Sequence, residues 1–157
     1  MGSGKSTVGR ILAKELNTYF LDTDILIETF EGMKIKEIFK KYGENVFRKM
    51  ERKCFEWIKK NVKDTVISVG GGFPVFIPEI KEAGVVIYLK VSFEEILKRM
   101  SENEIEKRPL FQDIEKAREL YKKRDKVYSK LADFVIENKD IEKTLGYIKG
   151  VLNENRQ

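Results

Sequence analysis

The chain has 157 residues, of which 41% are hydrophobic and 36% charged, and its formal net charge is +5. This length and composition predict one soluble, globular domain, residues 1–157, with a sizeable core. The sequence contains no histidine, which excludes histidine-based acid–base catalysis and zinc sites with histidine ligands. The longest apolar run, Val85 to Leu89, is far too short for a membrane span, so we expect no membrane partner and a cytoplasmic location.

The single cysteine and the dispersed charge limit the possible catalytic roles and ligands further. Cys54 cannot form an internal disulfide, and its setting between Lys53 and Phe55 favours a helix-packing role over that of a nucleophile. Lysines alternate with glutamates along the chain, which indicates solvated, ion-paired faces. We therefore expect small anionic ligands as partners and no nucleic acid.

The N-terminal stretch from Gly2 to Thr7 reads Gly-Ser-Gly-Lys-Ser-Thr, and apolar residues at helical spacing follow it. Glycines allow backbone N–H groups to converge on an anion, and a helix N-terminus adds partial positive charge. In such a loop Lys5 reaches the β- and γ-phosphates of a nucleotide, and the Ser6 hydroxyl can bind Mg²⁺. The sequence therefore predicts the second half of a phosphate-binding loop.

Two other interpretations of this stretch exist, and one feature of it is unusual. The same residues match the N-myristoylation pattern, or they could be a glycine-rich tail, but neither explains both Lys5 and the helix that follows. The full loop pattern has another glycine just before Met1, after a buried strand. We therefore expect that about ten native N-terminal residues, including a first strand, are missing from the chain as written.

The first half of the chain predicts helices around a short strand. Helical spacing runs from Thr7 to a stop at Asn17, and Tyr19-Phe20-Leu21 is a strand candidate followed by Asp22-Thr23-Asp24. Ligands bind at the carboxyl ends of strands in open α/β sheets, so Asp22 and Asp24 are candidate site residues. Helical stretches follow from Ile25 to a break at Gly32, and from Ile35 to about Lys60 with a gap near Gly43.

The second half predicts strands that alternate with helices. Residues 65–69 and 85–89 are expected to form strands buried on both faces, and residues 133–137 a last strand before a helix over 141–153. Gly70-Gly71-Gly72 follows the first of these strands, where glycines allow a backbone to approach a ligand closely, although a flexible turn is the alternative. One short helix is expected after Pro74 and Pro78, then a capped helix from Ser92 to Met100 and a helix from about Ile114 to Tyr128. Residues 101–112 resemble a mobile loop, and the whole pattern predicts a parallel α/β sheet.

Each charged candidate also has an ordinary interpretation. The two aspartates could cap a helix or lie in a solvated turn, and Arg48, Arg108 and Arg124 could be surface charges. Their positions at the ends of predicted strands, in this order along the chain, favour a site.

The ordered set of motifs resembles the shikimate kinase family over nearly the whole length. The matching stretches are Gly2 to Gly9, Phe20 to Asp24 with Ile27-Glu28, Ile38-Phe39, Tyr42-Gly43-Glu44, Phe47-Arg48 with Glu51, Ile67 to Gly72, Arg108-Pro109-Leu110, Arg124 with Tyr128, and Ala132-Asp133. The resemblance implies a three-layer P-loop kinase fold with a central parallel sheet, helices on both faces and a lid at about 101–112.

The resemblance also implies residue roles for the nucleotide. Gly2, Ser3, Gly4, Lys5, Ser6 and Thr7 would wrap the phosphates of ATP, with Lys5 and Arg108 supplying positive charge. Ser6 would bind Mg²⁺ directly and Asp22 would bind it through water.

For the acceptor, the resemblance implies shikimate. Asp24 would contact its hydroxyl groups and lie nearest the attacking 3-hydroxyl. Arg48 and Arg124 would bind the carboxylate, which suits the planar guanidinium, and Gly71 would donate a backbone N–H.

The chain departs from the family in two places. Asn138-Lys139-Asp140 lacks the proline that usually packs on adenine, so Arg99 is the candidate for one side of that contact, and Asp125-Lys126-Val127 lacks a second common proline. Alternatives to a monomeric shikimate kinase are another metabolite kinase of the same fold, such as a gluconate or nucleoside-monophosphate kinase, or a nucleotide-binding module without catalysis.

Overall fold

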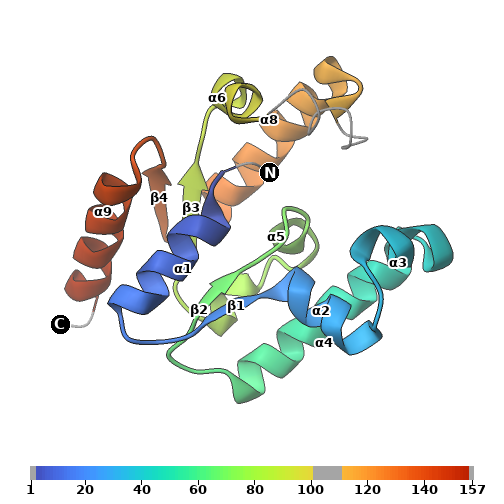
Figure 1. Ribbon diagram of the computed structural model, residues 1–157, viewed down its shortest axis with the longest axis horizontal. Helices are drawn as coiled ribbons and strands as arrows, with labels where there is room; N and C mark the ends of the chain where they lie inside the picture. Colours follow the sequence, from blue (N-terminus) through green and yellow to red (C-terminus); the bar gives the residue numbers. More distant parts are fainter. Residues whose placement is uncertain (1–2, 101–110, 156–157) are drawn as a thin grey trace. The chain divides into compact units, whose positions relative to one another are not determined.

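The computed structural model describes residues 3–100 and 111–155. The chain forms two compact units (Figure 1). We call Ser6–Val85 the N-terminal unit, and Met1–Lys5 with Val86–Gln157 the C-terminal unit. Each is described by itself.

The N-terminal unit is a parallel pair of strands with helices. Asp22 and Ser68, at the carboxyl ends of β1 and β2, are opposite each other in the register. Parallel strands need a crossover connection, and here three helices between the two strands provide it. The elements in order are α1 (Lys5–Glu15), β1 (Phe20–Asp22), α2 (Thr23–Glu31), α3 (Ile35–Tyr42), α4 (Glu44–Asn61), β2 (Val66–Ser68), α5 (Phe73–Phe76) and the 3₁₀ helix η1 (Ile80–Ala83).

The C-terminal unit is a second parallel pair. Strand β3 (Ile87–Lys90) pairs with β4 (Phe134–Glu137), with Ile87 opposite Phe134. Helices α6 (Phe93–Arg99) and α8 (Ile114–Leu131) lie between them in sequence, and α9 (Ile141–Glu154) follows β4. Helix α8 packs against β3, and α9 packs against β4 (Figure 1).

Side-chain caps and glycines define the helix ends. Ser92 accepts a hydrogen bond from the Glu95 N–H at the start of α6, as the capping-box pattern predicts, and Asp113 and Asp140 cap α8 and α9 in the same way. Gly32 ends α2 with φ 64°, a left-handed conformation that favours glycine. Gly43 separates α3 from α4 with φ 83°, so the predicted gap is confirmed.

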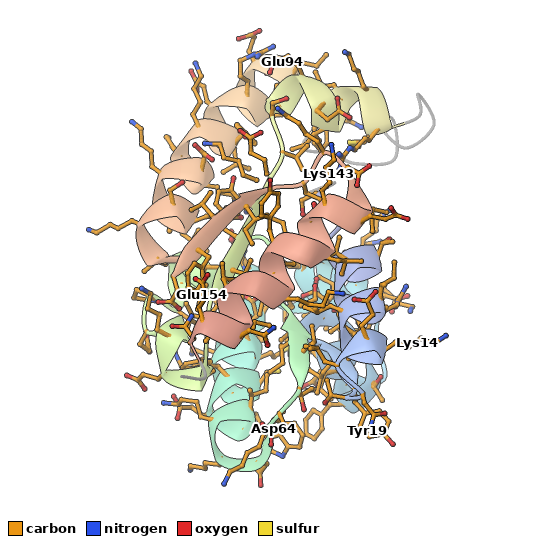
Figure 2. The ribbon with its side chains drawn as sticks, turned by 90° about the vertical axis from the view of Figure 1, so that its left-hand side faces the viewer. Lys14, Tyr19, Asp64, Glu94, Lys143 and Glu154 are labelled. Carbon is orange, nitrogen blue, oxygen red and sulfur yellow. The ribbon has the colours of Figure 1, made fainter. Side chains whose placement is uncertain are left out.

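Each unit has its own apolar cluster. In the N-terminal unit, α2, α3 and α4 bury Ile27, Ile38, Phe47, Cys54 and Ile58 against one another. In the C-terminal unit the cluster is built from Val91, Phe93, Ile96, Met100, Phe111 and Ala117. Charged side chains lie on the outer faces of the helices, as Lys14 on α1 and Glu94 on α6 show (Figure 2). None of the helices within 3–100 and 111–155 is long and apolar enough to cross a membrane.

The prediction that two strands are buried on both faces is wrong. Val66 and Ile67 of β2, and all four residues of β3, are only partly buried. The reason is that, in the described part of the chain, each strand hydrogen-bonds to a neighbour on one side only. A run of β-branched residues indicates a strand, but it does not report how many strands cover it. The boundaries also differ slightly: the first strand begins at Phe20, α5 begins at Phe73, ahead of Pro74, and α8 continues to Leu131.

Candidate active site

At the carboxyl end of β1, Asp22 begins helix α2 as its N-cap. Its Oδ1 accepts the backbone N–H of Asp24 at 2.9 Å and that of Ile25 at 3.2 Å. Both bonds go to one oxygen, so the cap leaves Oδ2 for another partner. The cap interpretation of Asp22 is therefore correct, and it is compatible with a second role.

The turn Gly70-Gly71-Gly72, which follows β2, comes into close contact with two predicted site residues. A Cβ atom placed on Gly70 would lie 3.0 Å from Asp24 Oδ1, and one placed on Gly72 would lie 2.5 Å from both terminal nitrogens of Arg48. A Cβ at 2.5 Å from these atoms would force the side chain to move. The glycines thus allow a carboxylate and a guanidinium to pack directly on the backbone, on either side of Gly71. The N-terminal unit therefore places Asp24 and Arg48 on either side of Gly71.

Arg48, on α4, is held by two glutamates of the same helix. Its Nη1 donates to Glu51 Oε1, and its Nε and Nη2 donate to Glu44 Oε1 at 3.3 and 3.1 Å. The Arg48 side chain is 15% exposed and that of Glu51 only 1%. The guanidinium also lies over the ring of Phe76, 4.3 Å from its centroid. Three of its five N–H groups thus donate to these glutamates, and the other two suit a ligand.

The glutamates that position Arg48 were missed as functional residues. Glu44 and Glu51 were noted only as matching positions, although they lie four residues before and three residues after Arg48. Such spacing places side chains on one helix face and is a usable signal for ion pairs. Phe76 carried no such signal, because its contact with Arg48 depends on how α5 packs on α4.

Cys54 is a core residue, as its helical setting predicts. It packs between α2 and α4 in the cluster around Ile27. Burial, with Glu51 and Asp24 nearby, raises the pKa of its thiol from 9.0 to about 11. A thiol with this pKa is almost entirely protonated at neutral pH, so it is a poor nucleophile.

The predicted phosphate loop is described from Ser3 onward, and Gly2 lies outside the described residues. Gly4 has φ 76°, and α1 begins directly after it at Lys5. Ser6 and Thr7 occupy the first turn of α1, where backbone N–H groups have no partner within the helix. This arrangement, a left-handed glycine before a helix N-terminus, is suited to an anion.

In the C-terminal unit the loop contacts the segment after β4. The side chain of Asn138 donates to the carbonyl oxygen of Ser3 at 2.5 Å. Arg99, the candidate for the adenine contact, donates from Nη2 to the Asn138 carbonyl oxygen at 2.6 Å and from Nε to Glu95 at 3.2 Å.

Arg124 lies on α8 and is partly buried. Its neighbour Asp125 fixes this part of the helix on β3, because it accepts hydrogen bonds from the Tyr88 hydroxyl at 2.8 Å and from Lys90 Nζ at 3.1 Å. Burial and the hydrogen bond to Asp125 raise the pKa of Tyr88. Arg124 itself has no ion-pair partner among residues 3–100 and 111–155, in contrast to Arg48. Arg108 and most of the predicted lid, residues 101–110, lie outside the described residues.

A glycine loop at a helix N-terminus, parallel strands, and a carboxylate and a guanidinium beside a glycine turn at a strand end define a phosphotransferase of the P-loop class. Comparison with known proteins identifies the family within this class. A family model described as shikimate kinase matches residues 1–152. The chain belongs to the shikimate kinase family.

Known relatives and solved structures agree with this assignment. The chain is 46% identical over 136 residues to a shikimate kinase of Helicobacter hepaticus, covering 87% of this chain and 81% of the relative. It is 46% identical over 148 residues to a shikimate kinase of Clostridium botulinum (strain Loch Maree / Type A3), covering 91% and 86%.

Among solved structures, the chain resembles a shikimate kinase from Acinetobacter baumannii in complex with shikimate, with 35% identity and a TM-score of 0.86 over 99% of this chain and 89% of that one. It also resembles a shikimate kinase from Aquifex aeolicus, with 33% identity and a TM-score of 0.83 over 99% and 94%. The predicted P-loop α/β fold and phosphotransferase class are confirmed.

Proposed function

We propose that this protein transfers the γ-phosphate of ATP to the 3-hydroxyl of shikimate. The observation that carries the proposal is the turn Gly70-Gly71-Gly72, which packs on Asp24 at one end and on Arg48 at the other. A carboxylate suited to orienting hydroxyl groups and a guanidinium suited to binding a carboxylate match the two ends of a small hydroxy acid.

In this proposal the nucleotide phosphates bind at the loop from Gly2 to Thr7. The backbone N–H groups at the start of α1 and the ammonium of Lys5 offset the phosphate charge. Arg108 is proposed to add positive charge from the lid, about 101–112. Phosphoryl transfer has a loose transition state, so the protein acts mainly by positioning the reactants and stabilising charge.

The residues present fit a Mg²⁺ ion. Ser6 offers a hydroxyl and Asp22 offers Oδ2, both hard oxygen donors of the kind that Mg²⁺ prefers. The hydroxyls of Thr23 and Ser68, next to Asp22 in sequence and in register, are buried without a hydrogen-bond partner among the described residues, which suits a hydrated cation. We propose that Ser6 binds the ion directly and Asp22 through water; the ion would supply charge neutralisation at the phosphates.

The acceptor is proposed to bind through its two chemically different ends. Arg48, with its two further N–H groups, and Arg124 bind the shikimate carboxylate, and Gly71 adds a backbone N–H. Asp24 accepts a hydrogen bond from the 3-hydroxyl and takes its proton as the bond to phosphorus forms. Asp24 needs to be ionised for this role, so Asp24→Asn should lower kcat strongly.

The test is ADP release in a coupled assay with the full chain, ATP and Mg²⁺. We expect turnover that depends on shikimate, little turnover with gluconate or a nucleoside monophosphate as acceptor, and little with the methyl ester of shikimate, which lacks the carboxylate charge. Absence of shikimate-dependent turnover, while ATP still binds, would overturn the proposal and favour the non-catalytic nucleotide-binding module.

We also propose that the chain acts as a monomer and as one domain, because every proposed role is filled by a residue of the same chain. Light scattering at micromolar concentration should give a mass near 18.4 kDa. A dimer that persists on dilution would contradict this.

A further inference from the structure

Asn138, the first residue after β4, is a buried polar residue with an unusual number of partners. It is 3% exposed. Its backbone N–H donates to the Lys90 carbonyl oxygen at 2.9 Å, and its carbonyl oxygen accepts from Arg99 at 2.6 Å. These bonds fix its backbone between β3 and α6, so the position of its side chain is determined.

The Asn138 side chain joins two segments that are far apart in sequence. Its Nδ2 donates to the Ser3 carbonyl oxygen at 2.5 Å, across 135 positions of the chain. Its Oδ1 lies 3.0 Å from the hydroxyl of Thr144, which also lies 2.7 Å from the Asp140 carbonyl oxygen. Because a carbonyl oxygen only accepts, the amide must present its NH₂ to Ser3, and its Oδ1 then faces the Thr144 hydroxyl, whose single proton is shared between Asn138 Oδ1 and the Asp140 carbonyl oxygen.

The bond to Ser3 has a direct consequence for the phosphate loop. In a trans peptide the carbonyl of one residue and the N–H of the next point in opposite directions. When Asn138 holds the Ser3 carbonyl, the Gly4 N–H is therefore directed away from Asn138. An N–H that faces outward at the start of a helix is a donor for an anion.

Gly4 fits this role in two ways. Its φ of 76° is strained for other residues, and a Cβ atom there would lie 3.0 Å from Asn138 Nδ2. A side chain at position 4 would thus interfere with the amide that holds the loop. The close approach of the amide is a second reason for glycine, independent of the backbone angle.

We propose that Asn138 is a positioning residue for nucleotide binding: through the Ser3–Gly4 peptide it directs the Gly4 N–H toward the β-phosphate. This rests on the proposed function insofar as the loop binds a nucleotide. Asn138 itself contacts no phosphate. Its effect is confined to the phosphate end of the nucleotide, and this separates it from a residue that only stabilises the fold.

The test compares the affinities of ADP and AMP, measured by calorimetry on the full chain. ADP has the β-phosphate and AMP lacks it. For Asn138→Ala we expect the Kd of ADP to rise at least tenfold, about 1.4 kcal/mol, while the Kd of AMP changes less than twofold. Ser92→Ala, which removes the cap of α6 in the same unit, is the matched control, since it should lower Tm and leave both Kd values unchanged. Equal weakening of ADP and AMP by Asn138→Ala would overturn the proposal.

Two further measurements keep the test decisive if Asn138→Ala does not fold. Asn138→Leu has nearly the same volume but no donor, and it should give the same ADP-specific loss. In the unmodified protein with ADP bound, the Gly4 amide nitrogen should show a scalar coupling to the β-phosphorus by NMR. If that coupling is absent, the Gly4 N–H is not a phosphate donor and the proposal fails. None of these measurements uses shikimate, so a chain that passes them but does not phosphorylate shikimate refutes the proposed function alone.

Discussion

At the scale of single residues, the informative feature is that contacts within the protein hold the Arg48 side chain in place. Two glutamates take three of its N–H groups, and Phe76 covers one face of the guanidinium. A side chain fixed in this way loses little rotamer freedom when a carboxylate binds. In the proposed carboxylate-binding role of Arg48, these ion pairs would reduce the entropic cost of binding.

The first prediction concerns Arg48→Lys. Lysine keeps the positive charge beside Glu51, which is 1% exposed and would be costly to leave unpaired. The lysine ammonium, however, cannot make the paired hydrogen bonds that a planar guanidinium makes with a carboxylate. We expect the KM for shikimate to rise by about 10- to 100-fold, equivalent to roughly 1.4–2.7 kcal/mol, with the KM for ATP within twofold. Steady-state kinetics in both substrates measures this.

Arg48→Ala should raise the KM for shikimate further, but it also removes a positively charged partner of the buried Glu51 carboxylate, so its Tm must be measured beside its kinetics. Lys53→Ala, on the same helix, is the control. Equal increases in the two KM values for Arg48→Lys would remove Arg48 from the acid-binding site.

The second prediction follows from the raised pKa of Cys54. In the native protein the pKa of the thiol is about 11, against 9.0 when exposed. At pH 8 the thiolate fraction should thus be about 100-fold lower than in the unfolded chain. We expect reaction with a disulfide reagent at pH 8 to be at least tenfold slower in the folded protein, because the greater nucleophilicity of a high-pKa thiolate offsets only part of this difference and burial restricts access. Reaction at the unfolded rate would show that Cys54 is accessible and ionised.

The same shift links stability to pH. Because the folded state binds the thiol proton more tightly, the contribution to stability is complete below pH 9 and is lost as pH rises from 9 to about 11, by an amount on the order of 2–3 kcal/mol. Lysines and tyrosines also titrate in this window, so the comparison is with Cys54→Val. As pH rises from 8 to 11, the free energy of unfolding of the parent should fall relative to that of Cys54→Val, which has no thiol to titrate.

The site residues differ in how far sequence could predict them. Asp22, Asp24 and the glycine turn were predictable, because ligands gather at the carboxyl ends of parallel strands and glycines mark close approach. In the sequence, Asn138 was noted only because the segment Asn138-Lys139-Asp140 lacks a proline that is common in the family. Its contact with Ser3 joins residues 135 positions apart, and no local pattern of spacing encodes such a pair.

At the scale of elements, helix boundaries followed local rules closely. Gly32, Gly43, Ser92 and Asn17 end or begin helices where the sequence indicates, because caps and left-handed glycines act within a few residues. The burial of the strands did not follow such local rules, because it depends on neighbouring strands that the sequence of one strand does not specify. The position and type of a helix or strand are thus encoded locally in the sequence, whereas the burial of a strand is not.

The third prediction uses two glycines in different settings. Gly146, within α9, is exposed and has open space around its α-carbon, so Gly146→Ala should raise the free energy of unfolding by about 0.5–1 kcal/mol. Gly32 also has open space around its α-carbon, but its φ of 64° disfavours alanine. Gly32→Ala should therefore lower the free energy of unfolding by about 1–2 kcal/mol. Denaturant unfolding measures both. A stabilising Gly32→Ala would contradict the left-handed cap.

At the scale of the whole molecule, the chain has two compact units but is proposed to act as one domain that binds two ligands. Proposed nucleotide residues occur in the loop that reaches Asn138, and two of the proposed acceptor residues, Asp24 and Arg48, pack on the glycine turn. If the units unfold together, a ligand that binds to either one stabilises the whole chain by mass action. Calorimetry should therefore show one transition with or without ligand.

The fourth prediction compares the Tm shifts that two ligands, shikimate and ADP, cause in two variants. At a concentration 100 times its Kd, a ligand adds about 2.7 kcal/mol to the free energy of unfolding, or roughly 5–11 °C in Tm for a chain of this size. At the concentrations that produce this in the parent protein, Arg48→Lys should lose at least about half of the shift from shikimate and keep that from ADP. Asn138→Ala should lose much of the shift from ADP and keep that from shikimate. General destabilisation would lower every Tm without changing the ligand shifts, so it cannot reproduce this opposite pattern. If both variants lost both shifts equally, the residue roles proposed for the two sites would be wrong even where the kinase activity is real.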